Sequence, residues 1–208
     1  FNSDVGSLVT GSMKYLTKIF EKATSLVDGN LAGWNTSSVE TFENAFNSAE
    51  MFDGDLSGWD TSSAENMVSM FEGAINFTGT AGSSNDINAW RTSRVRKMNS
   101  MFLGAKSFNV PDLSGWDVSR VENMNYMFSE TMNFNGDLFN NTSSVTDMSN
   151  MFDEALAFNG NIRFLDTSRV TSMAYMFQYV LSHALGSARR FWSLSLPTVL
   201  KSFVLTCN

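Results

Sequence analysis

Charged and amide side chains recur at one fixed place in the sequence, between a tryptophan and a threonine or their substitutes. We call them the charged row: Asn35, Asp60, Arg91, Asp117, Asn141 and Asp166. A catalytic acid and base need carboxyl groups in dissimilar environments, whereas Asp60, Asp117 and Asp166 occupy equivalent positions. Nucleophilic catalysis needs a base beside the nucleophile, and the single histidine, His183, falls outside the periodic pattern. The sequence therefore predicts a protein that is not an enzyme.

A second periodic set of acidic and amide residues flanks glycines that follow a phenylalanine. We call it the loop row: Asp53, Asp55, Asn135, Asp137, Asn159 and Asn161. Calcium takes about six to eight oxygen ligands, more than one Asp-Gly-Asp loop supplies unless adjacent loops share the ion. Asp and Asn also bond their own backbone in turns, and this reading is favoured. Cys207 and His183 alone cannot form a zinc site, so we expect no metal and no cofactor.

An imperfect repeat of about 25 residues runs through most of the chain. Its most regular feature is a phenylalanine that recurs 24 to 31 residues after the previous one: Phe20, Phe46, Phe71, Phe102, Phe128, Phe152 and Phe177. The longest interval contains an insertion rich in Gly, Ser and Thr at residues 78–85. Self-similarity at this period is typical of proteins built from stacked structural repeats. We therefore predict one repeat domain over residues 1–177.

Two spacings within each repeat predict the local structure. Leu56, Trp59 and Thr61 have the spacing of a short strand in a leucine-rich repeat. The apolar residues over 64–74 then recur at helical spacing, and Ser62 with Glu65 matches a helix capping box. The predicted fold is α/β: a leucine-rich-repeat-like, right-handed solenoid with one short parallel strand and one helix per repeat.

The net charge argues against a nucleic-acid partner. The whole chain carries −7, and residues 1–177 carry 11 basic and 21 acidic side chains, a net of −10. Binding to phosphate backbones calls for a clustered basic face. One local cluster, Arg91, Arg94, Arg96 and Lys97, is interpreted as the solvated start of a helix. The sequence contains no apolar run long enough for a transmembrane helix.

Two stretches depart from the repeat. One repeat is a residue short, so Phe139 is expected to fill the tryptophan position through a bulge or a shifted strand. The pattern stops at Gln178, and residues 178–208 are basic and contain no acidic residue. This tail is interpreted either as a C-terminal cap, which stacked repeats need, or as the edge of a fragment or a reading-frame artefact.

The repeat resembles that of a known family. Residues 52–71, with the sequence FDGDLSGWDTSSAENMVSMF, and residues 108–128 show the resemblance most fully. This combination is similar to the repeat of about 26 residues in the BspA-like leucine-rich-repeat surface proteins. The resemblance implies a secreted or cell-surface protein without enzymatic activity that contacts other macromolecules, in some members by adhesion to host or matrix proteins.

Two functions follow as hypotheses: an interaction or adhesion module, or a passive spacer within a larger surface protein. For the first, we expect a protein partner on the strand face, at Asp60, Arg91, Asp117 and Asp166, because a row of mixed charge discriminates among partners. The sequence also contains four acceptor motifs for N-glycosylation, which matter only if a eukaryotic cell secretes the protein: Asn35, Asn76, Asn140 and Asn141.

Overall fold

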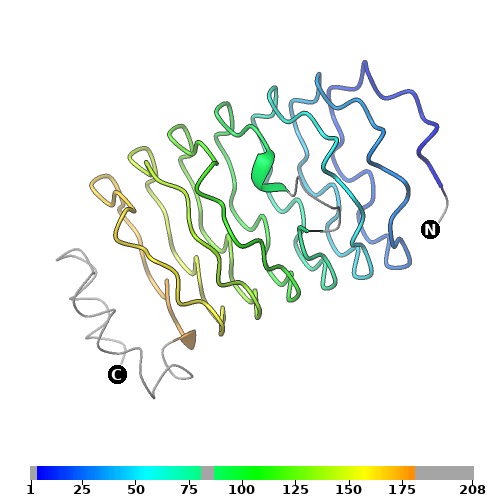
Figure 1. Cartoon of the computed structure of the whole chain (residues 1–208). Helices are drawn as coiled ribbons and strands as arrows, with labels where there is room; N and C mark the ends of the chain where they lie inside the picture. The colour runs from blue at the N-terminus through cyan, green and yellow to red at the C-terminus, as the bar shows by residue number, and fades with distance from the viewer. Residues whose placement is uncertain (1–3, 81–86, 181–208) are drawn as a thin grey trace.

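The structure is a computed structural model that describes residues 4–80 and 87–180. Successive repeats, which we call units, lie side by side from the N-terminal to the C-terminal end (Figure 1). Isolated parallel bridges join one unit to the next through a column of equivalent residues: Tyr15, Thr41, Asn66, Lys97, Asn123, Asp147 and Ser172. One further bridge joins Asp112 to Asp137. The helix that the structure describes in full is η1, a 3-10 helix over Ile87–Ala89.

The predicted α/β solenoid is wrong. Within residues 4–80 and 87–180, no α-helix covers the stretches predicted to be helical, and the bridges stay isolated without forming strands or a sheet. The main column of bridges also lies away from the tryptophans on which the strands were expected to centre. The predicted capping box fails with the helix, because the Ser62 N–H instead donates to Asp60 Oδ1.

Consecutive turns replace the predicted helix. Met67–Met70 and Phe71–Ala74 are each closed by a hydrogen bond from the fourth N–H to the first carbonyl. The third residues, Ser69 and Gly73, have φ of 52° and 67°, as the third residue of a type II turn requires. The first and fourth residues of successive turns fall at i, i+3, i+4 and i+7, which is also the spacing of one helix face. The apolar pattern therefore fits both structures.

Bonding between units explains why the turns form. The Met67 N–H donates to the Lys97 carbonyl at 3.0 Å and the Phe71 N–H donates to the Met101 carbonyl at 2.9 Å. In an α-helix each would instead bond four residues back in its own unit. Because neighbouring units satisfy these buried backbone groups, the stack holds together along its whole length.

The same turn geometry recurs in every unit. The third turn positions that carry a side chain all have positive φ between 52° and 60°. L-residues rarely adopt this conformation, so each position is held by the bonds on either side of it. These residues are Lys18, Lys22, Asn44, Ser48, Ser69, Ser100, Tyr126, Glu130, Asn150, Glu154, Tyr175 and Tyr179.

The interior is filled by columns of one residue type. The phenylalanines that mark the repeat stack on one another, with centroids of neighbouring rings 5.3–5.7 Å apart. A second column consists of Phe52, Phe77, Phe108, Phe134 and Phe158. Ten methionines at the turn positions are all buried and pack in the core, where their flexible side chains fill irregular gaps.

The three departures from the repeat have different outcomes. Phe139 is fully buried, and Asn141 after it has a positive φ of 58°, which none of the other charged-row residues has. The short unit is therefore accommodated by a local change of backbone conformation. The insertion lies partly outside the described residues, since residues 81–86 are not described. The interpretation of residues 178–208 as a cap or fragment edge concerns a tail that lies outside the described residues from 181 onwards.

Candidate interaction face

The charged row runs along the outside of the stack. Asp60 is half-buried, and the other members are exposed. Four members of the row are anchored through their backbone, because a buried threonine of the preceding unit donates to the row carbonyl. Thr61 Oγ1 donates to the Arg91 carbonyl, and Thr92 Oγ1 donates to the Asp117 carbonyl, both at 3.0 Å. Successive row residues are therefore fixed one unit apart.

The aspartates of the row are also fixed through their side chains. Asp60 Oδ1 accepts from the Ser62 N–H at 2.9 Å, and Asp117 Oδ1 accepts from the Ser119 N–H at 3.0 Å. Asp166 Oδ1 accepts from the N–H of the serine two residues later at 2.9 Å. Aspartates form such turns with their own backbone in loops. The aspartate side chains of the row are thus oriented before any partner arrives.

The same hydrogen bonds keep these carboxylates ionised. Hydrogen bonds from Ser62 lower the pKa of Asp60, and the nearby Arg91 guanidinium lowers it further. Hydrogen bonds from Ser119 lower the pKa of Asp117. Both groups therefore stay negative to a lower pH than an ordinary aspartate does. With Arg91 in the unit between them, three consecutive units present the charges −, + and −.

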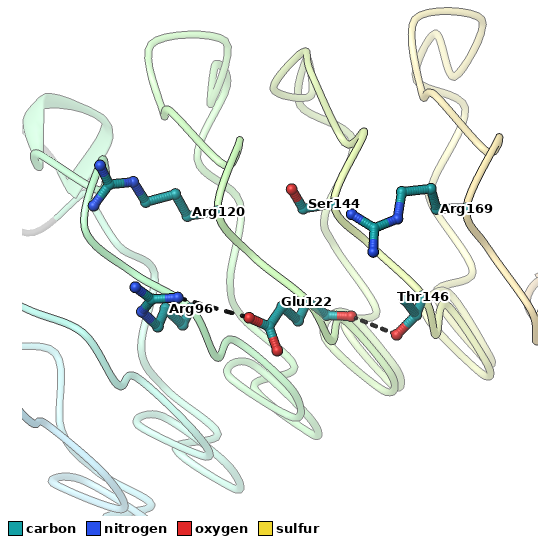
Figure 2. Close-up of a pocket in the computed structure, with 6 residues that line it drawn as sticks. All are labelled: Arg96, Arg120, Glu122, Ser144, Thr146 and Arg169. Carbon is teal, nitrogen blue, oxygen red and sulfur yellow. Dashed lines mark hydrogen bonds and ion pairs between the residues drawn. The ribbon is translucent and has the colours of Figure 1, made fainter.

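The structure adds arginines that sequence reasoning did not single out. Arg120 and Arg169 line a cavity of about 280 Å³ together with Arg96 (Figure 2). We call this cavity the arginine pocket; its other lining residues are Glu122, Ser144 and Thr146. The sequence signal was present but weak: Arg120 and Arg169 occupy the same place in their units as Arg94, directly before a valine.

The interpretation of the basic cluster as a helix start is wrong, since no helix begins there. Arg91, Arg94, Arg96 and Lys97 are all exposed. Arg96 lies 3.8 Å from Glu122 in the next unit and belongs to the arginine pocket. Part of the cluster therefore contributes to a surface that spans several units.

The loop row follows the expected turn chemistry only in part, because Asp55 and Asn161 accept within their own turns, whereas Asp53 and Asn135 accept from the neighbouring unit. Asp53 Oδ1 accepts from the N–H and from Oγ1 of Thr78, at 2.9 and 2.8 Å. Asp55 Oδ1 accepts from the N–H of the serine two residues later at 2.8 Å, and Asn135 Oδ1 accepts from the Asn159 N–H at 2.7 Å. These oxygens join loops within a unit and between neighbouring units.

The four asparagines of the glycosylation motifs are exposed. Asn35 Oδ1 accepts from the N–H and from Oγ of Ser37. Asn141 Oδ1 accepts from Ser143 Oγ at 2.8 Å. In both residues the side-chain oxygen accepts these bonds, and the side-chain amide nitrogen takes no part in them. The motifs remain a prediction.

Comparison with protein families shows to which family the repeats belong. A family model matches residues 1–85 and again residues 77–185. The chain belongs to the DUF285 family. DUF285 is described as a Mycoplasma protein of unknown function, so membership brings no activity, ligand or partner. No curated protein and no solved structure matches the chain. The resemblance of this DUF285 chain to BspA-like surface proteins accordingly stays a prediction.

A helix needs about 20 apolar residues to cross a bilayer. No helix within residues 4–80 and 87–180 is long and apolar enough.

Proposed function

We propose that this protein is a non-enzymatic interaction scaffold of the cell surface or extracellular space, which binds a partner protein along the charged row. The observation that supports the proposal most is the fixed orientation of the aspartates in the row. Asp60 and Asp117 are held by hydrogen bonds from Ser62 and Ser119. Side chains that are already ordered lose less entropy on binding.

The alternation of charge supports selectivity for a partner. Asp60, Arg91 and Asp117 lie in three consecutive units, so a partner must present the opposite sequence of charges at a matching spacing. A partner with the wrong order is disfavoured by like charges. A nucleic acid, which is negative throughout, does not meet this requirement.

A triple variant tests the row. Asp60→Ala, Arg91→Glu and Asp117→Ala leave the net charge unchanged and alter no fully buried side chain. Cell-surface proteins that bind to the immobilised wild-type chain would be identified. Their affinity for the wild type and for the triple variant would then be measured. We expect the variant to lose about tenfold or more in affinity, because each fixed charge contributes on the order of 1 kcal/mol or more to a specific contact.

A matched control carries Asp28→Ala, Lys106→Glu and Asp137→Ala, three exposed positions outside the row with the same change of charge. The control should bind like the wild type. Equal affinity of all three chains for the partner would contradict the proposed row. If no protein binds the wild-type chain saturably, the passive spacer becomes the better account.

A further inference from the structure

Two tyrosines are exposed on the turns of the C-terminal units. Tyr126 and Tyr175 each occupy the third position of a turn that the following methionine N–H closes. The tyrosines are 38% and 61% exposed, so they do not serve to fill the core. In other units the same position holds lysine, asparagine or serine: Lys18, Asn44, Ser69, Ser100 and Asn150.

The fold itself does not favour tyrosine at these two positions. Tyr126 and Tyr175 have positive φ, 56° and 60°, a conformation that bulky residues adopt less readily than asparagine does. A ring left in water also gains little of the free energy that burial supplies. Exposed tyrosines are instead typical of binding surfaces, where they are among the residues that contribute most to affinity. Both tyrosines are therefore candidates for contact with a partner.

Backbone hydrogen bonds place the two tyrosines on one surface. The Tyr126 N–H donates to the Ser149 carbonyl at 3.0 Å. In the next unit, the Asn150 N–H donates to the Ala174 carbonyl at 2.9 Å. These three units are the last that the structure describes, and they run from yellow-green to orange in Figure 1. Adjacent parallel segments lie about 4.8 Å apart, so the backbones of Tyr126 and Tyr175 are separated by roughly 10 Å.

The turns that carry the tyrosines are acidic. Segments 123–130, 147–154 and 172–180 contain no lysine or arginine, and they contain four acids: Glu130, Asp147, Asp153 and Glu154. Lys97 and Lys106 belong to the preceding unit. No ion pair joins the four acids to these lysines or to any other base within residues 4–80 and 87–180. This surface therefore carries negative charge that the described part of the chain does not neutralise.

Three of the acids lie close enough to repel one another. The Glu130 N–H donates to the Asp153 carbonyl at 2.7 Å, and Glu154 follows Asp153 directly. Burial raises the pKa of Asp153, and the carboxylates of Glu154 and Glu130 raise it further. Asp153 Oδ1 is buried and has no hydrogen-bond partner. A positive group bound at this surface would offset the repulsion.

We propose that these turns, which we call the tyrosine patch, bind a basic peptide segment of another protein. The patch consists of Tyr126, Glu130, Asn150, Glu154 and Tyr175. Cations bind over aromatic rings, and arginine does so more often than lysine. Carboxylates pair with guanidinium groups through charge-assisted hydrogen bonds. The patch shares no residue with the charged row, so the inference does not depend on the proposed function.

The spacing of the patch indicates how the basic residues should be arranged. An extended peptide advances about 3.3 Å per residue, so every third residue recurs after roughly 10 Å. This matches the separation of Tyr126 and Tyr175. Nucleic acids and other polyanions are repelled by the acids. A neutral oligosaccharide would contact the rings but leave the carboxylates without a counter-charge, so a basic peptide fits better.

Titration calorimetry of the full 208-residue chain at physiological ionic strength tests the patch. The first probe is a short Gly-Ser-Arg repeat peptide, which has arginine at every third position. The others are the same peptide with glutamine in place of arginine, and maltohexaose as a neutral oligosaccharide. We expect saturable binding of the arginine peptide alone. Absence of that binding, or tighter binding of maltohexaose or of the glutamine peptide, would overturn the proposal.

A double variant separates the tyrosines from general charge. Tyr126→Ser with Tyr175→Asn introduces residues that other units carry at this position and leaves the net charge unchanged. The variant should melt no lower than the wild type, because both residues tolerate the turn, yet bind the arginine peptide about tenfold more weakly. The control, Tyr15→Thr with Phe164→Ala, removes two exposed aromatic residues elsewhere and should change affinity less than about twofold. Unchanged affinity in the patch variant, or equal losses in both, would contradict the site.

A second pair of variants tests the acids. Glu130→Gln with Glu154→Gln removes two charges from the patch with little change of shape and should weaken peptide binding about tenfold. Glu50→Gln with Glu65→Gln removes the same charge from exposed positions in other units. Its effect should stay below about threefold, because salt screens distant charges. Equal losses in the two variants would show nonspecific attraction to an acidic protein and overturn the site.

Discussion

The Trp116 indole N–H donates to the backbone carbonyl of Ile87, with 2.9 Å between Nε1 and O. The two residues belong to adjacent units, and both are buried. The equivalent bond from Trp90 Nε1 to the Leu56 carbonyl is longer, at 3.4 Å. The tryptophan column therefore contributes hydrogen bonds between units as well as apolar packing, and its bonds differ in strength.

Replacing each tryptophan by phenylalanine should reveal that difference. Trp116→Phe removes one of the two hydrogen bonds that the Ile87 carbonyl accepts, the other coming from the Trp90 N–H at 3.1 Å, and should cost about 0.5–1.5 kcal/mol in addition to lost packing. Trp90→Phe should cost less, because a bond of 3.4 Å is weaker. Urea unfolding of both variants measures the two losses. An equal or larger loss for Trp90→Phe would show that the indole bonds do not contribute as described.

The buried threonine hydroxyls should stabilise the stack more than exposed ones. Thr92→Val removes the bond from Oγ1 to the Asp117 carbonyl with little change of shape, and should cost about 1–2 kcal/mol. Thr171→Val removes an exposed bond to the Thr146 carbonyl, where water replaces the hydroxyl, and should cost less than about 0.5 kcal/mol. Thermal unfolding of the two variants compares them. Equal effects would argue against the buried ladder.

The positive φ of Ser100, 56°, predicts opposite effects of two substitutions. Ser100→Gly should be neutral or stabilising, because it relieves a conformation that costs L-residues about 1–2 kcal/mol. Ser100→Val should destabilise by at least about 1 kcal/mol, because a branched side chain tolerates positive φ poorly. In a helix interior, glycine would instead cost about 0.5–1 kcal/mol. Denaturant unfolding of both variants measures the sign of each change in the free energy of unfolding.

The sequence was sufficient to assign which side chains lie inside. Met67, Met70, Phe71 and Ala74 were expected to share one buried face, and all four are buried. Their backbone was predicted wrongly, because consecutive turns and a helix place apolar residues at the same spacing. The choice between them depends on hydrogen bonds from one unit to the next, such as that from the Phe71 N–H to Met101. A single repeat does not contain that information.

The candidate site could be predicted from the sequence only in part, for a similar reason. The charged row could be read from its fixed place in the repeat, whereas the turn formed by Asp60 and Ser62 was mistaken for a helix start. The arginine pocket depends on side chains from four units. Arg120 and Arg169 lie 49 residues apart in the sequence, and they share a cavity only because the units stack.

The pKa of Asp117 predicts a loss of stability in acid. Hydrogen bonds from Ser119 lower this pKa below its ordinary value of 3.8. The stabilisation is therefore complete above the ordinary pKa and disappears as the pH falls through the lowered folded pKa. Asp117→Asn retains an oxygen that can accept from Ser119 and removes the charge. The melting temperature of the wild type should exceed that of the variant at neutral pH, and this excess should shrink in acid.

The pKa of Asp153 predicts the opposite dependence. Burial raises it above 3.8, and the Glu154 and Glu130 carboxylates raise it further. Its buried Oδ1 has no hydrogen-bond partner. The ionised form therefore costs stability above the raised pKa, and protonation in acid relieves the cost. Asp153→Asn should melt above the wild type at neutral pH, and the difference should vanish in acid. A lower melting temperature for Asp153→Asn at neutral pH would contradict this assignment.

The stacked turns, which position both the charged row and the tyrosine patch, are tested most directly by the backbone φ of Ser69 in solution. Nuclear magnetic resonance couplings and chemical shifts of the labelled chain measure this angle. The predicted result is a positive φ near 52°, with non-helical shifts at the neighbouring residues. A negative φ near −63°, the value of an α-helix, with helical shifts over residues 64–74, would contradict the structure and both proposed binding surfaces.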